Sequence, residues 1–195
     1  FAIGDLINTG FSYNRSLGGS SMALRPVNQI NQMNPASYTS QDTMSFLLQA
    51  GLSGRSSFIK TSRESDNLNN VNLNYLVMGF PITPWWKFST GLVPFSRIQY
   101  DFRQYIEDSH ELAVEYRGKG GYNEFYFGSA LQFTKFLSAG FNAGYLFGAL
   151  NRESSIDVPE QTVASTKITE DYIADDFYFR AGLQIHPVFY GKNRK

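Results

Sequence analysis

Apolar and polar side chains alternate with a period of two along much of the chain. In 138–151, Phe141 and Tyr145 fall on one face, and Asn142 and Gly144 fall on the other. Successive side chains of a β-strand point to opposite faces, so this pattern predicts a strand with one apolar face. The same alternation predicts six long strands, at 43–60, 70–82, 86–104, 121–134, 138–151 and 174–187.

Short and long connections alternate between these strands. Tight connections at 81–86 and 135–138 predict antiparallel hairpins between sequence neighbours. Longer polar segments lie at 61–69, 105–120 and 152–172, and within the second of these 109–117 is predicted to be the arm of a protruding loop. Tight turns at one end and long loops at the other are typical of outer-membrane barrels.

Strand length and the polar faces favour a membrane barrel over a soluble sheet. A tilted strand needs about nine to eleven residues to cross a bilayer, whereas strands of soluble domains have about five or six. The polar faces carry glycines and amides such as Asn142 and Gln184, which suit a crowded or water-filled lumen. The alternative is a soluble β-sandwich binding module, in which Phe125, Phe127, Phe141 and Phe147 would form a dry core.

Composition excludes several classes of protein. The 195 residues contain 17 Lys and Arg against 17 Asp and Glu, so no net charge favours nucleic acid as a partner. Cysteine is absent, and His110 and His186 lack a metal-ligand spacing, so we expect neither a metal nor a cofactor. The longest apolar run, 75–82, is far shorter than the roughly eighteen residues of a transmembrane helix. No signal-peptide pattern opens the chain, so we expect a mature outer-membrane protein whose signal has been removed.

Motifs for catalysis are missing as well. The chain has no Gly-x-Ser-x-Gly, and Gly18 and Gly19 are followed by serines without the lysine of a phosphate-binding loop. Neither histidine has a nucleophile or acid at a spacing that indicates a catalytic pair. We therefore expect no catalytic residues and no enzymatic activity.

Glycine-rich motifs before and within the strands resemble those of a known family. About forty residues without a period of two precede the first strand, and they contain Gly18-Gly19 and Asn34-Pro35-Ala36. Similar short motifs follow at 79–83, 118–128 and 138–148. Together these motifs resemble FadL-like outer-membrane proteins, in particular the members from Bacteroidetes.

This resemblance implies an all-β, antiparallel outer-membrane barrel of fourteen strands that is plugged by an N-terminal hatch. Residues 1–42 would be the hatch, and 43–195 would be the first six or so strands. Because single-chain barrels begin at about eight strands, a second chain, a larger outer-membrane complex or further sequence would complete the barrel within the membrane lipid.

The resemblance also implies a function, namely passive uptake of hydrophobic, fatty-acid-like small molecules. The alternative is a barrel subunit of a larger outer-membrane assembly, such as a secretion translocon, that transports nothing. An apolar pocket beside the hatch would favour uptake, whereas a lumen filled by side chains would favour the structural role.

Pro94 interrupts the strand 86–104 between Val93 and Phe95. Proline has no amide hydrogen for the ladder, so a bulge or a broken pair is expected here. In FadL-like proteins a kink in the third strand opens a lateral window for the ligand, and Pro94 lies in the corresponding strand. The other interpretation is a bulge near the end of the strand.

Four charged side chains are predicted to face the lumen, where charge costs less than on the lipid face. They are Arg55, Arg97, Glu124 and Arg180. We expect them to anchor the hatch by salt bridges, in preference to binding a ligand carboxylate.

Overall fold

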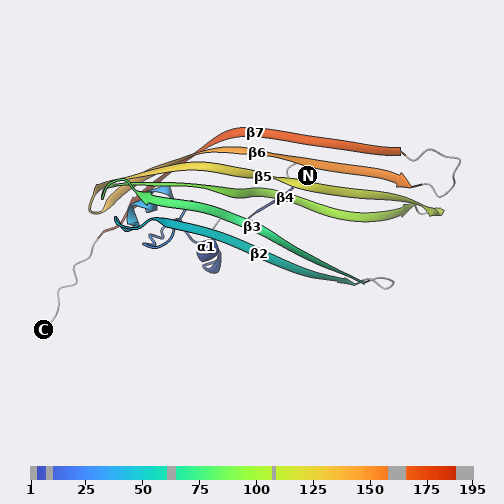
Figure 1. The fold of residues 1–195 in the computed structure, drawn as a ribbon, viewed down its shortest axis with the longest axis horizontal. Helices are drawn as coiled ribbons and strands as arrows, with labels where there is room; N and C mark the ends of the chain where they lie inside the picture. The colour runs from blue at the N-terminus through green and yellow to red at the C-terminus, as the bar shows by residue number, and fades with distance from the viewer. Residues whose placement is uncertain (1–3, 8–10, 61–64, 107–108, 158–165, 188–195) are drawn as a thin grey trace. The chain divides into compact units, whose positions relative to one another are not determined.

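The computed structural model describes residues 4–7, 11–60, 65–106, 109–157 and 166–187. In this part of the chain, two short helices accompany seven strands (Figure 1). In chain order the elements are β1 (Asp5–Leu6), α1 (Ser12–Ser16), the 3-10 helix η1 (Pro35–Ser40), β2 (Leu47–Lys60), β3 (Ser65–Pro81), β4 (Trp86–Ile106), β5 (Ser109–Thr134), β6 (Leu137–Asp157) and β7 (Thr166–Ile185). No helix of the described residues is long and apolar enough to span a membrane.

The long strands form one antiparallel sheet in the order β2-β3-β4-β5-β6-β7, so each strand pairs with its neighbours in sequence (Figure 1). β2 and β3 are paired from Leu47↔Gly79 to Lys60↔Ser65. The tight turns at 82–85 and 135–136 connect neighbouring strands as expected. The all-β class and the neighbour order are confirmed. The path ends at β2 and β7, and the sheet does not close on itself in the described residues.

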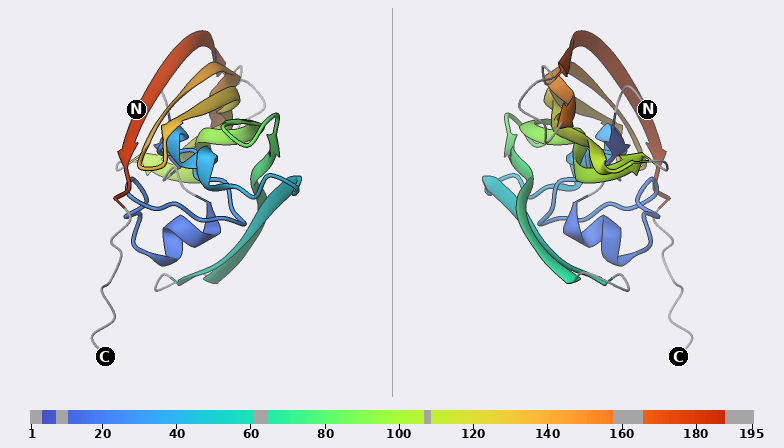
Figure 2. Two further views of the ribbon diagram at one scale, coloured as in Figure 1. Left: turned by 90° about the vertical axis from the view of Figure 1, so that its left-hand side faces the viewer. Right: turned by 90° about the vertical axis from the view of Figure 1, so that its right-hand side faces the viewer.

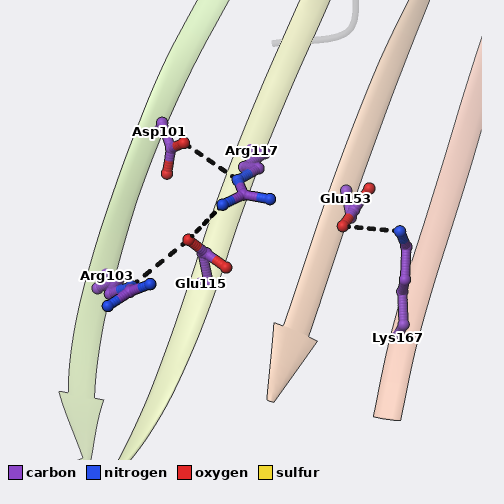
Figure 3. Close-up of polar contacts among 6 residues, drawn as sticks. All are labelled: Asp101, Arg103, Glu115, Arg117, Glu153 and Lys167. Carbon is purple, nitrogen blue, oxygen red and sulfur yellow. Dashed lines mark hydrogen bonds and ion pairs between the residues drawn. The ribbon is translucent and has the colours of Figure 1, made fainter. Parts of the chain in front are cut away.

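The strands are longer than the sequence predicts. Segment 109–117, predicted to be the arm of a loop, belongs to β5, and β4 continues to Ile106. The prediction failed because charged residues were taken as a sign of a loop. In the structure these charges face each other across strands, with Arg117 3.0 Å from Asp101 and Lys167 2.8 Å from Glu153 (Figure 3). Opposite charges on neighbouring strands stabilise the pairing, so polar segments can extend a sheet.

The chain forms two compact units, and β4 to β7 contribute residues to both. The first consists of Phe1–Asn8, Pro94–Glu124 and Tyr145–Phe177, and the second of Thr9–Val93, Phe125–Gly144 and Tyr178–Lys195. Both helices and both tight turns therefore belong to the second unit.

The core of the second unit lies between the sheet and the residues that precede β2. We call residues 11–42 the N-terminal segment. Its α1 and η1 lie on the same side of β2 and β3 (Figure 2). The buried apolar side chains of this core are Phe11, Ile30, Tyr38, Tyr75, Val77, Val93, Tyr126 and Ala130. Within the second unit, one face of the sheet is thus covered by the N-terminal segment.

The structure exposes the four phenylalanines that the sandwich interpretation places in a dry core. Phe127 is 50% exposed and Phe141 is 54% exposed, and Phe125 and Phe147 are also exposed. A β-sandwich would bury these side chains between two sheets. The structure therefore contradicts the dry core on which the sandwich interpretation depends.

Candidate functional site

The candidate site is the contact between the N-terminal segment and the sheet of the second unit. The segment begins with α1, which ends at two glycines. Gly18 (φ +65°) donates its N–H to Arg15 O at 3.0 Å, and Gly19 (φ +83°) donates to Asn14 O at 2.8 Å. Glycine adopts positive φ at little cost, and nothing lies within 4 Å of a Cβ added to either residue. The two glycines of the hatch motif therefore serve to end a helix.

The second hatch motif, Asn34-Pro35-Ala36, begins η1. Asn34 Oδ1 accepts a hydrogen bond from the Ala36 N–H at 3.1 Å, and its Nδ2 donates to Met22 O at 2.7 Å. Proline suits the first helical position, since the N–H that it lacks would have no partner within the helix. All three residues are buried. The motif therefore caps η1 and ties it to the chain that follows α1.

Replacing Asn34 with alanine is expected to loosen η1. The change removes the cap and leaves Met22 O without its donor, so local opening should become easier by about 1–2 kcal/mol. Hydrogen–deuterium exchange of amides 36–41 measures this free energy. Asp42→Ala is the matched control, because Asp42 caps the Met44 N–H at 3.3 Å at an exposed position. Equal exchange rates in the two variants would contradict the role of Asn34.

Glycines of the sheet allow η1 to lie close to the backbone of the strands. A Cβ on Gly140 of β6 would lie 2.7 Å from Pro35 O and 2.8 Å from Ala36 N. A Cβ on Gly182 of β7 would collide with Asn34 Oδ1, and one on Gly128 of β5 would lie 2.6 Å from Tyr38 Cε2. Three neighbouring strands thus lack a side chain where the segment lies against them.

Arg25 joins the segment to two strands. Its Nη1 donates to Ser138 Oγ at 2.9 Å and to Gln184 Oε1 at 3.0 Å, and its Nη2 donates to Thr39 Oγ1 at 3.0 Å. Gln184 Nε2 donates in turn to Ala23 O at 2.8 Å. Burial lowers the pKa of the Arg25 guanidinium, which nevertheless stays protonated at neutral pH, as arginine does in proteins.

A second group of hydrogen bonds surrounds Tyr38. Its hydroxyl donates to Asn142 Oδ1 at 3.0 Å, and Asn142 Nδ2 donates to Gln32 O at 3.2 Å. Arg180 Nη1 also donates to Gln32 O, at 3.4 Å, and its guanidinium lies 5.5 Å from the centre of the Tyr178 ring. Burial raises the pKa of Tyr38, so its hydroxyl is a neutral donor.

The four charged residues predicted to face a lumen lie in different surroundings. Arg180 contacts the N-terminal segment, although its described hydrogen bond goes to a main-chain carbonyl where we expected a salt bridge. Glu124 of β5 is buried, and Arg97 pairs in register with Asp5 of β1. The side chain of Arg55 lies outside the described residues. Sequence reasoning missed Arg25, since a lone arginine outside any periodic segment gives no signal.

The ladder between β3 and β4 is interrupted beside Pro94. It extends from Pro81↔Lys87 to Leu76↔Leu92 and ends there in the described residues. Val93 and Pro94 are buried, and Phe95 O accepts a hydrogen bond from the Ile7 N–H at 2.9 Å. Just after Pro94, Ser96 and Arg97 are paired with Leu6 and Asp5 of β1.

One open hollow of about 550 Å³ adjoins the N-terminal segment of the second unit. Residues 180–185 of β7 and the segment residues Met22, Ala23, Met33 and Asn34 line it. β7 is the last strand of the sheet path, so this hollow lies at an edge of the described sheet. Across the part of the chain that the structure describes, no group of three His, Asp or Glu side chains could hold a metal ion.

Comparison with known proteins identifies the family. A family model described as BamG matches residues 1–194, so the chain belongs to the BamG family. Comparisons with curated proteins and with solved structures found no match. The resemblance to FadL-like proteins was therefore wrong. It rested on short glycine motifs. In the structure Gly18 and Gly19 end a helix and Gly140 packs closely against η1, and unrelated families can share such features.

Proposed function

We propose that this member of the BamG family is a non-transporting subunit of the outer-membrane barrel-assembly (BAM) complex. The family name supports an association with barrel assembly. The observation that carries the structural role is the filled face of the second unit, where Tyr38 and Ile30 of the N-terminal segment and Tyr126 of the sheet are almost completely buried against one another. Passive uptake of hydrophobic molecules was expected only from the FadL-like resemblance, and that basis has been removed.

An outer-membrane location is supported by the opposite face of the sheet. Phe127, Phe141 and Leu183 are at least half exposed there, and Phe179 is 78% exposed. An apolar band on alternate residues of antiparallel strands is the lipid-facing surface of an outer-membrane barrel. Trp85 and Trp86, with ring centroids 6.3 Å apart, lie at a tight turn, where an interfacial aromatic belt would be placed.

The open sheet supports a partner that completes a barrel. β2 and β7 end the sheet path, so each has one edge without a described partner strand. Unpaired backbone groups are not tolerated in the hydrocarbon of a bilayer, and closure removes such edges. We infer that further strands, from a longer form of this chain or from another subunit, pair with β2 and β7.

Purification from native membranes in mild detergent tests the proposed function. A tagged form of the complete protein should isolate together with the barrel-assembly machinery, while an equally abundant tagged porin should not. Depletion of this protein should lower the amount of folded outer-membrane proteins. Fatty-acid uptake, divided by the amount of folded outer-membrane protein, should stay unchanged. Isolation as a lone species, with lost fatty-acid uptake and normal outer-membrane protein levels, would refute the proposal.

A further inference from the structure

The odd-numbered side chains of β7 change character at Phe177. From 177 to 185 they are apolar and exposed, with Phe177 at 70%. Toward the start of the strand they include Asp175 and Asp171. Five residues of β7 before Phe177 carry a charge, whereas Arg180 is the only charged residue of β7 after it. The apolar, lipid-facing surface therefore ends near Phe177 on this strand.

An aromatic cluster lies where this change occurs, within the first unit. The ring centroid of Tyr145 in β6 is 5.9 Å from that of Phe147 and 5.0 Å from that of Phe177. The Tyr145 hydroxyl donates to Asp175 Oδ2 at 3.1 Å. Aromatic side chains gather at the two surfaces of an outer-membrane barrel's apolar band, where one end of a tyrosine is apolar and the other is wet. The cluster joins apolar rings to a carboxylate, which suits such an interface.

Beyond the cluster, polar side chains connect β6 and β7. Asn151 Nδ2 donates to Asp171 Oδ1 at 2.6 Å, and Lys167 Nζ lies 2.8 Å from Glu153 Oε1 (Figure 3). Every residue of 166–177 is exposed, so both faces of this part of β7 are open to its surroundings. Charges on the lipid face are costly at the bilayer midplane and cost little near its surfaces. These residues are therefore stable in water and would be destabilised among acyl chains.

The apolar part of β7 has the length of one membrane crossing. It extends over 177–185, and a tilted strand crosses the hydrocarbon with about nine to eleven residues. The whole of β7 has 20 residues, so about half of the strand is not needed for the crossing. Lipid contact that continued past Phe177 would bring Asp175 and Asp171 among the acyl chains. Length and charge thus place the end of the lipid contact at the same residue.

We propose that the cluster of Tyr145, Phe147 and Phe177 contacts the lipid headgroups at one surface of the bilayer, and that β7 projects from this surface into water over 166–175. Ile173 is the critical residue, because it is apolar and 79% exposed but lies between Asp171 and Asp175. The proposal places it in water. The inference rests on the outer-membrane location in the proposed function, and it adds where the contact with lipid ends.

Single cysteines test the boundary, since the chain has no cysteine of its own. Phe179→Cys and Ile173→Cys are a matched pair, because the native side chains are apolar, lie at odd-numbered positions of β7 and are 78% and 79% exposed. Each variant of the complete protein is labelled with a nitrobenzoxadiazole dye and folded into phosphatidylcholine vesicles. The dye at 179 should lose most of its emission to nitroxide-labelled phosphatidylcholine and little to iodide in the water. The dye at 173 should show the opposite pattern.

A second measurement does not depend on the dye. Ala181 lies at the centre of 177–185, so Ala181→Arg should lower the ratio of folded to unfolded protein in the same vesicles by about thirtyfold or more. Ile173→Arg removes a larger apolar side chain, yet it should lower this ratio by about fivefold at most, because position 173 is outside the hydrocarbon. Urea titration of the two variants measures both ratios.

The outcomes separate the boundary from the proposed function. Nitroxide quenching at both 179 and 173, or equally large losses in the two arginine variants, would overturn the boundary and leave the outer-membrane location standing. Iodide quenching at both positions would refute the outer-membrane location and the boundary together. The assembly role is measured separately, by isolation of the tagged protein with the barrel-assembly machinery.

Discussion

Replacing Gly140 with alanine should release η1 from the sheet. The added methyl group would lie 2.7 Å from both Pro35 C and Pro35 O. These are main-chain atoms, which cannot rotate away as a side chain can, so the helix must move. Overpacking of this kind costs about 1–3 kcal/mol, and 2 kcal/mol corresponds to about thirty-fold faster local opening. Hydrogen–deuterium exchange of amides 30–41, in the protein held in detergent, reports this opening.

Gly54→Ala is the matched control for this prediction. Gly54 is also a strand glycine, and nothing lies within 4 Å of its added Cβ. It should therefore leave exchange of amides 30–41 unchanged, while Gly140→Ala accelerates it. Slow exchange in both variants would show that close packing of η1 against Gly140 does not hold the helix on the sheet.

Replacing Arg25 with alanine should have the other large effect. The change removes the donors to Thr39, Ser138 and Gln184, and it leaves the fully buried Ser138 Oγ without this partner. A buried polar group that loses its partner costs about 1–3 kcal/mol, so we expect the N-terminal segment to be destabilised by about 2–4 kcal/mol. The measurement is the rate of chymotrypsin cleavage after Tyr38, which is 1% exposed and becomes accessible only when the segment opens.

Two variants show whether the effect comes from the hydrogen bonds of the guanidinium. Arg25→Lys keeps the charge but replaces a planar fork of donors by a single ammonium, so it should recover only part of the protection. Arg103→Ala removes an arginine whose side chain is 61% exposed and is paired with Glu115, and exposed pairs contribute about 0–1 kcal/mol. Cleavage that is no faster in Arg25→Ala than in Arg103→Ala would exclude Arg25 as the link between segment and sheet.

The alternation of side chains was sufficient to predict the strand elements and their order. In 138–151 it correctly indicated β6, and the two short connections correctly indicated hairpins. The predictions of strands and hairpins succeed because the period of two and the tight turn are properties of a few consecutive residues.

Loops and family were harder to predict. Charged residues in 109–117 looked like a solvated loop, yet Arg117 and Glu115 pair across to β4 and extend the sheet. The glycine motifs pointed to FadL-like proteins, while the family match is to BamG. Gly18 and Asn34 act at helix ends, and this role is common to many folds. Such residues therefore do not distinguish one family from another.

The period-two pattern is sufficient to predict an all-β chain whose strands each have one apolar and one polar face. The two faces of a strand follow from its own residues. The pattern holds no information on which side chains meet across the fold. Arg25 contacts Ser138 and Gln184, which are 113 and 159 positions away in sequence, and Gly140 faces Pro35 across a similar separation. Such contacts form only when the N-terminal segment folds onto the sheet. The candidate site was therefore decided by tertiary packing.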